Sequence, residues 1–115
     1  MVNRKKLYTF DDQFIKELDR VPKKFSGIVI DNNCKEYWLN GLKHKIDKPA
    51  IVFHDDKSEF WYVYGKLHRI GGPAITLSSF HKSEQYYIDG KRVTKEYHDL
   101  LFNMIKLKGM TNGIL

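Results

Sequence analysis

The chain has 115 residues, of which 42% are hydrophobic and 14% aromatic, and this composition excludes a disordered polypeptide. Its 20 lysines and arginines outnumber 14 aspartates and glutamates, and the net charge of +6 permits attraction to nucleic acid or acidic proteins without identifying either. A single cysteine excludes an internal disulfide framework, and no segment approaches the roughly 20 apolar residues of a membrane-spanning helix.

Residues 1–24 are predicted to form a basic lead-in followed by a short helix. No apolar run follows the basic start, so we expect no signal peptide and a cytoplasmic protein. Thr9 or Asp11 can cap the helix by accepting backbone N–H bonds. Phe14 and Leu18 belong to one apolar stripe that would face a sheet, and Pro22 ends the helix by restricting the residue before it.

The middle of the chain, residues 25–93, contains one phrase that recurs. Complete copies occupy residues 37–51 and 61–75, and a third begins at residue 86 and breaks off after residue 91. The glycines Gly41, Gly65 and Gly90 are 24 and 25 residues apart. A fixed period of this size indicates a repeat architecture.

Each copy is preceded by a β-branched run and a turn, which together predict a hairpin. The expected strand pairs are 27–30 with 36–40, 50–53 with 59–64, and 74–77 with 85–89, the last joined by a turn at 78–82. Hairpins in succession are joined by short local connections, so we expect an antiparallel meander of about six strands.

A second helix is predicted over residues 94–109. Thr94 is a good N-cap, and apolar residues from Tyr97 to Ile105 recur at helical spacing. Gly109 ends the helix. The expected fold is therefore α+β: one domain, residues 1–115, in which a β-hairpin-repeat meander lies between an N-terminal helix that covers the sheet and a C-terminal helix that caps its end.

The repeated phrase resembles the MORN hairpin in two patterns, Trp38-x-x-Gly41-x-x-His44 and Tyr62-x-x-Gly65-Lys66-x-His68. The continuation is similar to a variant in uncharacterised proteins of tailed bacteriophages and large DNA viruses, where His-Arg-x-Asp-Gly-Pro-Ala is usual. Here it reads His68-Arg69-x-x-Gly72-Pro73-Ala74, with Gly71 in place of the aspartate. The resemblance covers roughly residues 27–93. It implies a scaffold or binding surface in a viral protein that acts in the host cytoplasm.

The glycine, histidine and proline positions of the repeat are predicted to be structural joints between hairpins. Each imidazole is expected to bond backbone across the turn between hairpins. A metal site is disfavoured, because no cysteine or carboxylate recurs beside both histidines. The predicted joints are Gly41, His44, Pro49, Gly65, His68, Pro73 and Gly90.

Side chains alternate between the two faces of a strand, so the aromatic residues before each glycine divide into two sets. The set that includes Tyr37, Trp61 and Tyr86 is the more apolar and is expected to face the core. If the helices cover that face, the other set forms an open aromatic ridge; alternatively, its members pack as ordinary cross-strand pairs. The predicted ridge comprises Trp38, Tyr62, Tyr64 and Tyr87.

Basic residues follow each repeat glycine and are expected to line one edge of the sheet at intervals of about 10 Å, two strand spacings. Such a row can meet phosphates or acidic side chains, or it can be a solvated rim that discourages edge pairing. The residues are Lys43, Lys45, Lys66, Arg69, Lys91 and Arg92.

Together these observations predict a small non-enzymatic binding protein without cofactor, metal or membrane contact. The ridge would supply contact area and the basic residues would steer the encounter. The viral resemblance implies a host protein as partner, for example one of a defence or regulatory system. Two alternatives stay open: nucleic-acid binding by the same surface, and an enzyme with a pocket between the sheet and the C-terminal helix.

Overall fold

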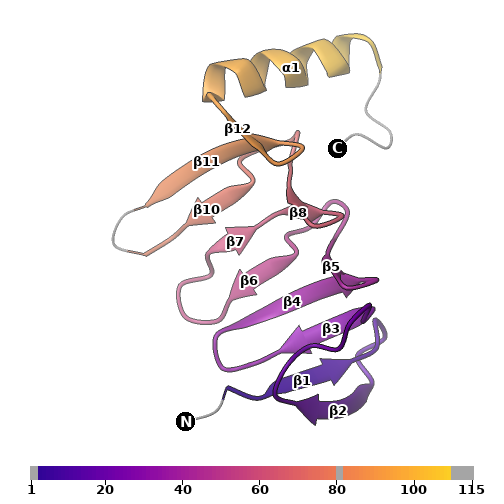
Figure 1. Cartoon of the computed structure of the whole chain (residues 1–115). Coiled ribbons are helices and arrows are strands. Elements are labelled where there is room, and N and C mark those ends of the chain that lie inside the picture. The colour runs from indigo at the N-terminus through magenta and orange to yellow at the C-terminus, as the bar shows by residue number, and fades with distance from the viewer. Residues whose placement is uncertain (1–2, 80–81, 110–115) are drawn as a thin grey trace.

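The computed structural model describes residues 3–79 and 82–109 of the chain (Figure 1). Antiparallel strands lie side by side like the rungs of a ladder, and one helix, α1 (Lys95–Leu107), lies across the C-terminal end. The molecule measures 46 × 33 × 21 Å. The meander and the C-terminal helix that the sequence predicts are confirmed.

No helix in the described ranges has both the length and the apolar character that crossing a membrane requires.

The N-terminal segment is a β-hairpin, and the predicted N-terminal helix is wrong. Strand β1 (Lys5–Tyr8) pairs on one side with β2 (Phe14–Leu18) and on the other with β3 (Gly27–Ile30). The hydroxyl of Thr9, the expected helix cap, accepts the N–H groups of Asp11 and Gln13 at 3.2 and 3.1 Å instead. Asp12 adopts a left-handed φ of 66°, which a helix does not allow.

Burial explains why the hairpin replaces the helix. Pairing with β3 extends the sheet and leaves Leu7 with 0% of its surface exposed. The stripe that would have been the apolar face of a helix gains little cover, since Phe14 and Ile15 remain 59% and 45% exposed on the outer strand. Strand β1 forms backbone hydrogen bonds with a strand on each side, and these bonds outweigh the local preference of the sequence for a helix.

The sheet also has more strands than the six expected. Its described order is β12-β11-β10-β7-β6-β4-β3-β1-β2, with β5 paired to β4 and with β8 and β9 forming a separate pair. The six expected strands correspond to β3, β4 (Cys34–Leu39), β6 (Ile51–Phe53), β7 (Glu59–Phe60) with β8 (Tyr62–Val63), β10 (Ile75–Leu77) and β11 (Ser83–Ile88). The expected turn at 78–82 lies partly outside the described residues.

The additional strands are the first hairpin and the short segments after each repeat glycine: β5 (Leu42–Lys43), β9 (Lys66–Leu67) and β12 (Lys91–Val93). These segments were predicted as joints only. Each one turns back and pairs with the strand before the glycine. The repeat is therefore a double hairpin, with a long arm in the sheet and a short arm at its edge.

The turns of the short arms stack in a column along one edge of the molecule (Figure 1). Each has two residues with positive φ, for example 47° at Tyr64 and 80° at Gly65, as in the type I′ turn that suits twisted strands. The glycine N–H of each turn donates to a carbonyl of the preceding unit: Gly65 to Lys43 at 2.8 Å, and Gly90 to Leu67 at 2.8 Å.

The repeat histidines bond the turn of the following unit. Nδ1 of His44 accepts the N–H of Tyr64 at 2.9 Å, and Nδ1 of His68 accepts the N–H of Asp89 at 2.9 Å. In the first unit the hydroxyl of Ser26 occupies the same place and accepts the N–H of Asn40 at 2.8 Å. Because each Nδ1 accepts a hydrogen, the imidazole proton in this arrangement belongs on Nε2.

Helix α1 packs on the last unit with a face different from the one the sequence predicts. Thr94 is the N-cap, and its hydroxyl accepts the N–H of Tyr97 at 3.1 Å. His98 is 2% exposed; its Nε2 lies 2.8 Å from the carbonyl oxygen of Arg69, and its ring centroid lies 4.8 Å from that of Tyr86. Tyr97, by contrast, is 55% exposed, so the buried side of the helix is defined by His98 and by Ile105 of the predicted face.

Candidate functional site

The aromatic residues of one sheet face come from three successive units. Trp38 lies in β4, Tyr62 in β8 and Tyr87 in β11, and all three are half-buried. Tyr86, the neighbour of Tyr87, points to the other face and packs against His98 of α1. The helix therefore covers the opposite face. We call the surface formed by Trp38, Lys43, Tyr62, Tyr87 and Arg92 the ridge.

Cross-strand pairing places two cations on the ridge. Lys43 is the partner of Trp38, and Arg92 is the partner of Tyr87, and directly paired residues share a face. The Nζ of Lys43 lies 5.8 Å from the ring centroid of Trp38 and 5.7 Å from that of Tyr62. Its ammonium group is thus shared by two rings, within the range of cation–π attraction.

A carboxylate fixes the first part of the ridge. Nε1 of Trp38 donates to Oε1 of Glu36 at 3.2 Å, and the other carboxylate oxygen of Glu36 lies 4.0 Å from Nζ of Lys43. The pKa of Tyr62 is raised, chiefly by burial and further by Glu36 and Tyr87. Glu36 therefore contacts both Trp38 and Lys43.

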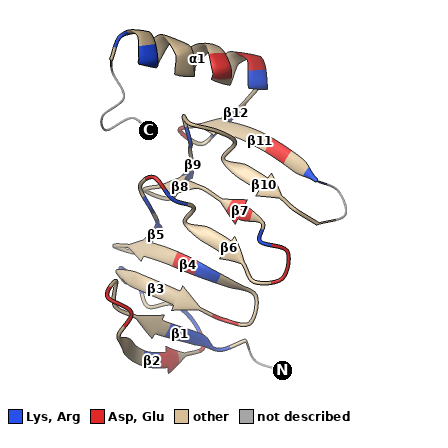
Figure 2. Ribbon diagram, turned by 180° about the vertical axis from the view of Figure 1, so that it is seen from behind, with Lys and Arg blue, Asp and Glu red and all other residues tan. Residues whose placement is uncertain are grey.

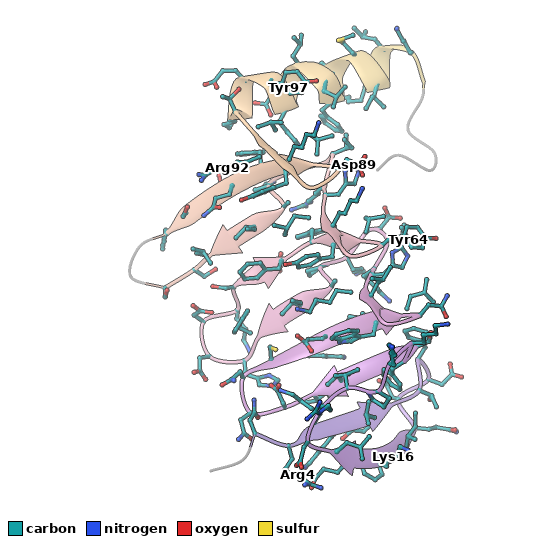
Figure 3. All side chains as sticks on the ribbon, in the orientation of Figure 1. Arg4, Lys16, Tyr64, Asp89, Arg92 and Tyr97 are labelled. Atoms are coloured by element: carbon teal, nitrogen blue, oxygen red, sulfur yellow. The ribbon has the colours of Figure 1, made fainter. Side chains whose placement is uncertain are left out.

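Tyr64 does not belong to this surface. It lies in the type I′ turn after β8, where the strand alternation has ended, and it is 61% exposed. Its ring stacks on the joint histidine His44, with centroids 4.1 Å apart. Figure 3 shows Tyr64 and Asp89 at the same edge, in the column of turns.

Figure 2 marks the lysines and arginines along the ribbon, and the contacts of their side chains divide the predicted basic rim between two faces. Lys43 and Arg92 lie on the ridge, whereas the guanidinium of Arg69 lies 3.7 Å from the ring centroid of Trp61 on the opposite face. Lys45 likewise lies 4.3 Å from the ring of Tyr37. The exposed residues Lys66 and Lys91 pair with Val63 and Ile88, away from the ridge aromatics.

The opposite face contains three lysines that sequence reasoning missed. A pocket of about 680 Å³ beside Tyr37 is lined by the predicted Lys45 and by Lys35, Lys48 and Lys57, which were not predicted. Comparing the two copies position by position would have indicated this basic site, because Lys35 in the first copy corresponds to the oppositely charged Glu59 in the second.

The joint prolines lie in the loops that lead into the next long arm. Pro49 lines the same pocket, and the carbonyl of Pro73 accepts a hydrogen bond from Nη1 of Arg69 at 3.2 Å.

Among the described residues, no group of three or more histidine, cysteine or acidic side chains is arranged to hold a metal ion.

No protein-family model, no curated protein and no solved structure matches the chain. The MORN-like resemblance therefore stays a prediction.

Proposed function

We propose that this chain is a non-catalytic binding protein that recognises a partner protein through the ridge. The observation on which this depends is the placement of the Lys43 ammonium between the rings of Trp38 and Tyr62, on the sheet face away from α1. Tyr87 and Arg92 extend the same surface. Tryptophan, tyrosine and arginine are the residues that most often dominate binding energy at protein interfaces.

The ridge residues support this proposal because they are already ordered. Trp38 is fixed by Glu36, and the Lys43 side chain lies against two rings, so a partner would meet a surface that loses little side-chain freedom on binding. Rings that are half-buried in the free protein still offer area to a partner. The carboxylate of Glu36 beside Lys43 favours a partner with both donor and acid groups.

The class of partner that we propose is a host-cell protein, and this part depends on the resemblance to viral repeat proteins alone. Inhibition of a host defence or regulatory protein is the corresponding role.

Affinity capture with matched variants tests the proposal. Tagged wild-type chain, Lys43→Glu and Tyr62→Ala are compared with Phe14→Ala, whose ring is 59% exposed on β2, at the other end of the sheet from α1. We expect both ridge variants to capture about tenfold less of one protein, which corresponds to a loss of about 1.4 kcal/mol in binding free energy. The control variant should capture as much of that protein as the wild type does. If no captured protein shows this pattern while the variants remain folded, the proposal is wrong.

A second candidate is single-stranded nucleic acid, favoured by the exposed Arg92 beside the ring of Tyr87 and by Lys43 between two further rings. Bases stack on aromatic side chains while cations follow the backbone. Fluorescence anisotropy with a labelled oligonucleotide would then show binding that weakens steeply as salt rises. Absence of binding at low salt excludes this candidate.

A further inference from the structure

The pocket on the face opposite the ridge is a second candidate site, independent of the function proposed above. It has a volume of about 680 Å³, within the usual range of small-molecule sites. Tyr37 and Val52 supply apolar walls, while Lys35, Lys45, Lys48 and Lys57 lie around them.

The pocket is open because α1 covers only the equivalent place in the next unit. There, His98 lies against the Arg69 carbonyl, and Phe102 lines a smaller cavity of about 240 Å³. Ile70 in that unit is 1% exposed, whereas its counterpart Ile46 at the open pocket is 49% exposed. The same repeat loop is therefore closed in one copy and accessible in the other.

The positive charge of the open pocket is largely specific to its own unit. Lys45 corresponds to Arg69 and belongs to the common repeat. Lys35, however, corresponds to Glu59, and Lys48 corresponds to Gly72. A common structural role for the loop explains the shared cation but does not explain the additional ones.

Two of the four ammonium groups lie over an aromatic ring instead of beside carboxylates. The Nζ atoms of Lys45 and Lys35 lie 4.3 and 5.4 Å from the ring centroid of Tyr37. None of the four lysines has a carboxylate within ion-pair distance among the described residues, although Asp47 lines the same pocket. Because like charges repel at this spacing, an anion placed between them would be stabilised.

One wall of the pocket is fixed independently of any ligand. Nε2 of His54 lies 2.9 Å from the carbonyl oxygen of Asp31, and this bond joins two neighbouring hairpin turns. The backbone N–H of His54 also donates to the carbonyl of Asn33 at 2.9 Å. The segment at His54, which lines the pocket, is therefore positioned before a ligand arrives.

We propose that this pocket binds a small phosphate-bearing ligand with a planar ring, of the nucleoside phosphate class. The lysines would contact the phosphate oxygens through charge-assisted hydrogen bonds, and the ring would lie against the apolar wall of Tyr37 and Val52. The single carboxylate of Asp47 offers an acceptor for a sugar hydroxyl. A neutral apolar ligand would leave four cations without a counter-charge.

Isothermal titration calorimetry and amide chemical-shift mapping test this assignment with three probes: adenosine 5′-monophosphate, adenosine and inorganic phosphate. We expect saturable binding of the nucleotide at residues 35–57, and affinities at least tenfold lower for adenosine and for phosphate. Equal affinity of either fragment and the nucleotide, shifts confined to the ridge, or no binding would each overturn the proposal.

Lys35→Glu gives the first unit the residue of the second and should weaken nucleotide binding about tenfold or more, because a charge-assisted bond becomes a repulsion. Lys48→Ala, in an exposed loop, gives a second variant that does not disturb a strand. Lys16→Glu makes the same charge change on the distant strand β2 and should bind normally. Equal loss in Lys16→Glu would attribute binding to net charge and refute the site, and ridge variants should leave it unchanged.

Discussion

Replacing His44 by alanine should destabilise the chain by removing a joint between units. The substitution deletes the Nδ1 acceptor of the Tyr64 N–H, a bond of 2.9 Å, and the ring that stacks on Tyr64 at 4.1 Å. An unsatisfied buried donor costs about 1–3 kcal/mol. Because Tyr64 is 61% exposed and water can reach its N–H, we expect the lower part of that range, about 1–2 kcal/mol.

The same joint predicts a pH dependence. Burial lowers the pKa of His44 below its ordinary value of 6.5, so the unfolded chain takes up the proton first as pH falls. The stability that this site contributes is therefore fully present above pH 6.5, and it declines as pH falls from 6.5 towards the lower pKa of the folded chain. Protonation of Nδ1 would also replace the acceptor of the Tyr64 N–H by a donor.

His44→Asn is the matched control. The asparagine Oδ1 is attached to Cγ, as Nδ1 is in histidine, so it can accept the same N–H but does not titrate. Thermal unfolding followed by circular dichroism at pH 7.5 should show His44→Ala melting about 4–8 °C below wild type, at about 4 °C per kcal/mol, and His44→Asn melting between them. At pH 5 the advantage of wild type over His44→Asn should shrink.

Two results would refute this reasoning. An unchanged melting temperature for His44→Ala would show that the joint bond is replaced by water at no cost. A wild-type advantage over His44→Asn that is the same at pH 5 and pH 7.5 would show that the imidazole does not titrate with unfolding. Comparison of variants is necessary because the chain contains five histidines.

Two further predictions concern backbone and thiol. Gly41 has φ of +81°, and a Cβ there would lie 2.9 Å from the backbone nitrogen of Lys24, so Gly41→Ala should cost about 2 kcal/mol or more in urea unfolding. Gly71→Ala, where a Cβ meets nothing within 4 Å, should cost less than about 0.5 kcal/mol; equal costs would contradict the turn geometry. Burial chiefly, with Glu36 and Asp31, raises the pKa of Cys34 from 9.0 to about 12. Iodoacetamide at pH 8 should therefore modify the folded chain about a hundredfold more slowly than the urea-unfolded chain, and comparable rates would show an accessible thiolate.

The elements that the sequence predicts correctly are those with a repeated or strongly periodic pattern. Three hairpins followed from the glycine spacing, and α1 followed from the Thr94 cap and its apolar spacing. The N-terminal hairpin could not be predicted in this way, because Thr9 and Phe14 fit a helix start locally. What decides their conformation is the free edge of β3, which only the folded sheet provides.

The candidate site was predictable only where strand alternation holds. Alternation predicts that Trp38, Tyr62 and Tyr87 share one face; in the structure Lys43, the partner of Trp38, lies 5.7 Å from the ring centroid of Tyr62, and Arg92 is the partner of Tyr87. It failed for Tyr64, because the two-residue turn ends the alternation there. It also failed for the cations, since each position after a glycine takes the face of its cross-strand partner, as Lys43 does opposite Trp38.

The pocket depends on a feature that no single repeat contains. Each unit bonds the next through its turns, so any unit in the middle of the array leaves the face beside its loop uncovered. Helix α1 ends the array and covers that face for one unit only, through His98 and Phe102. The loop of the preceding unit, which contains Ile46 and Lys48, is not covered by α1. Its side chains can therefore change without disturbing the hydrogen bonds between turns. This separation explains how a repeat with fixed turn bonds can present different chemistry on its two faces.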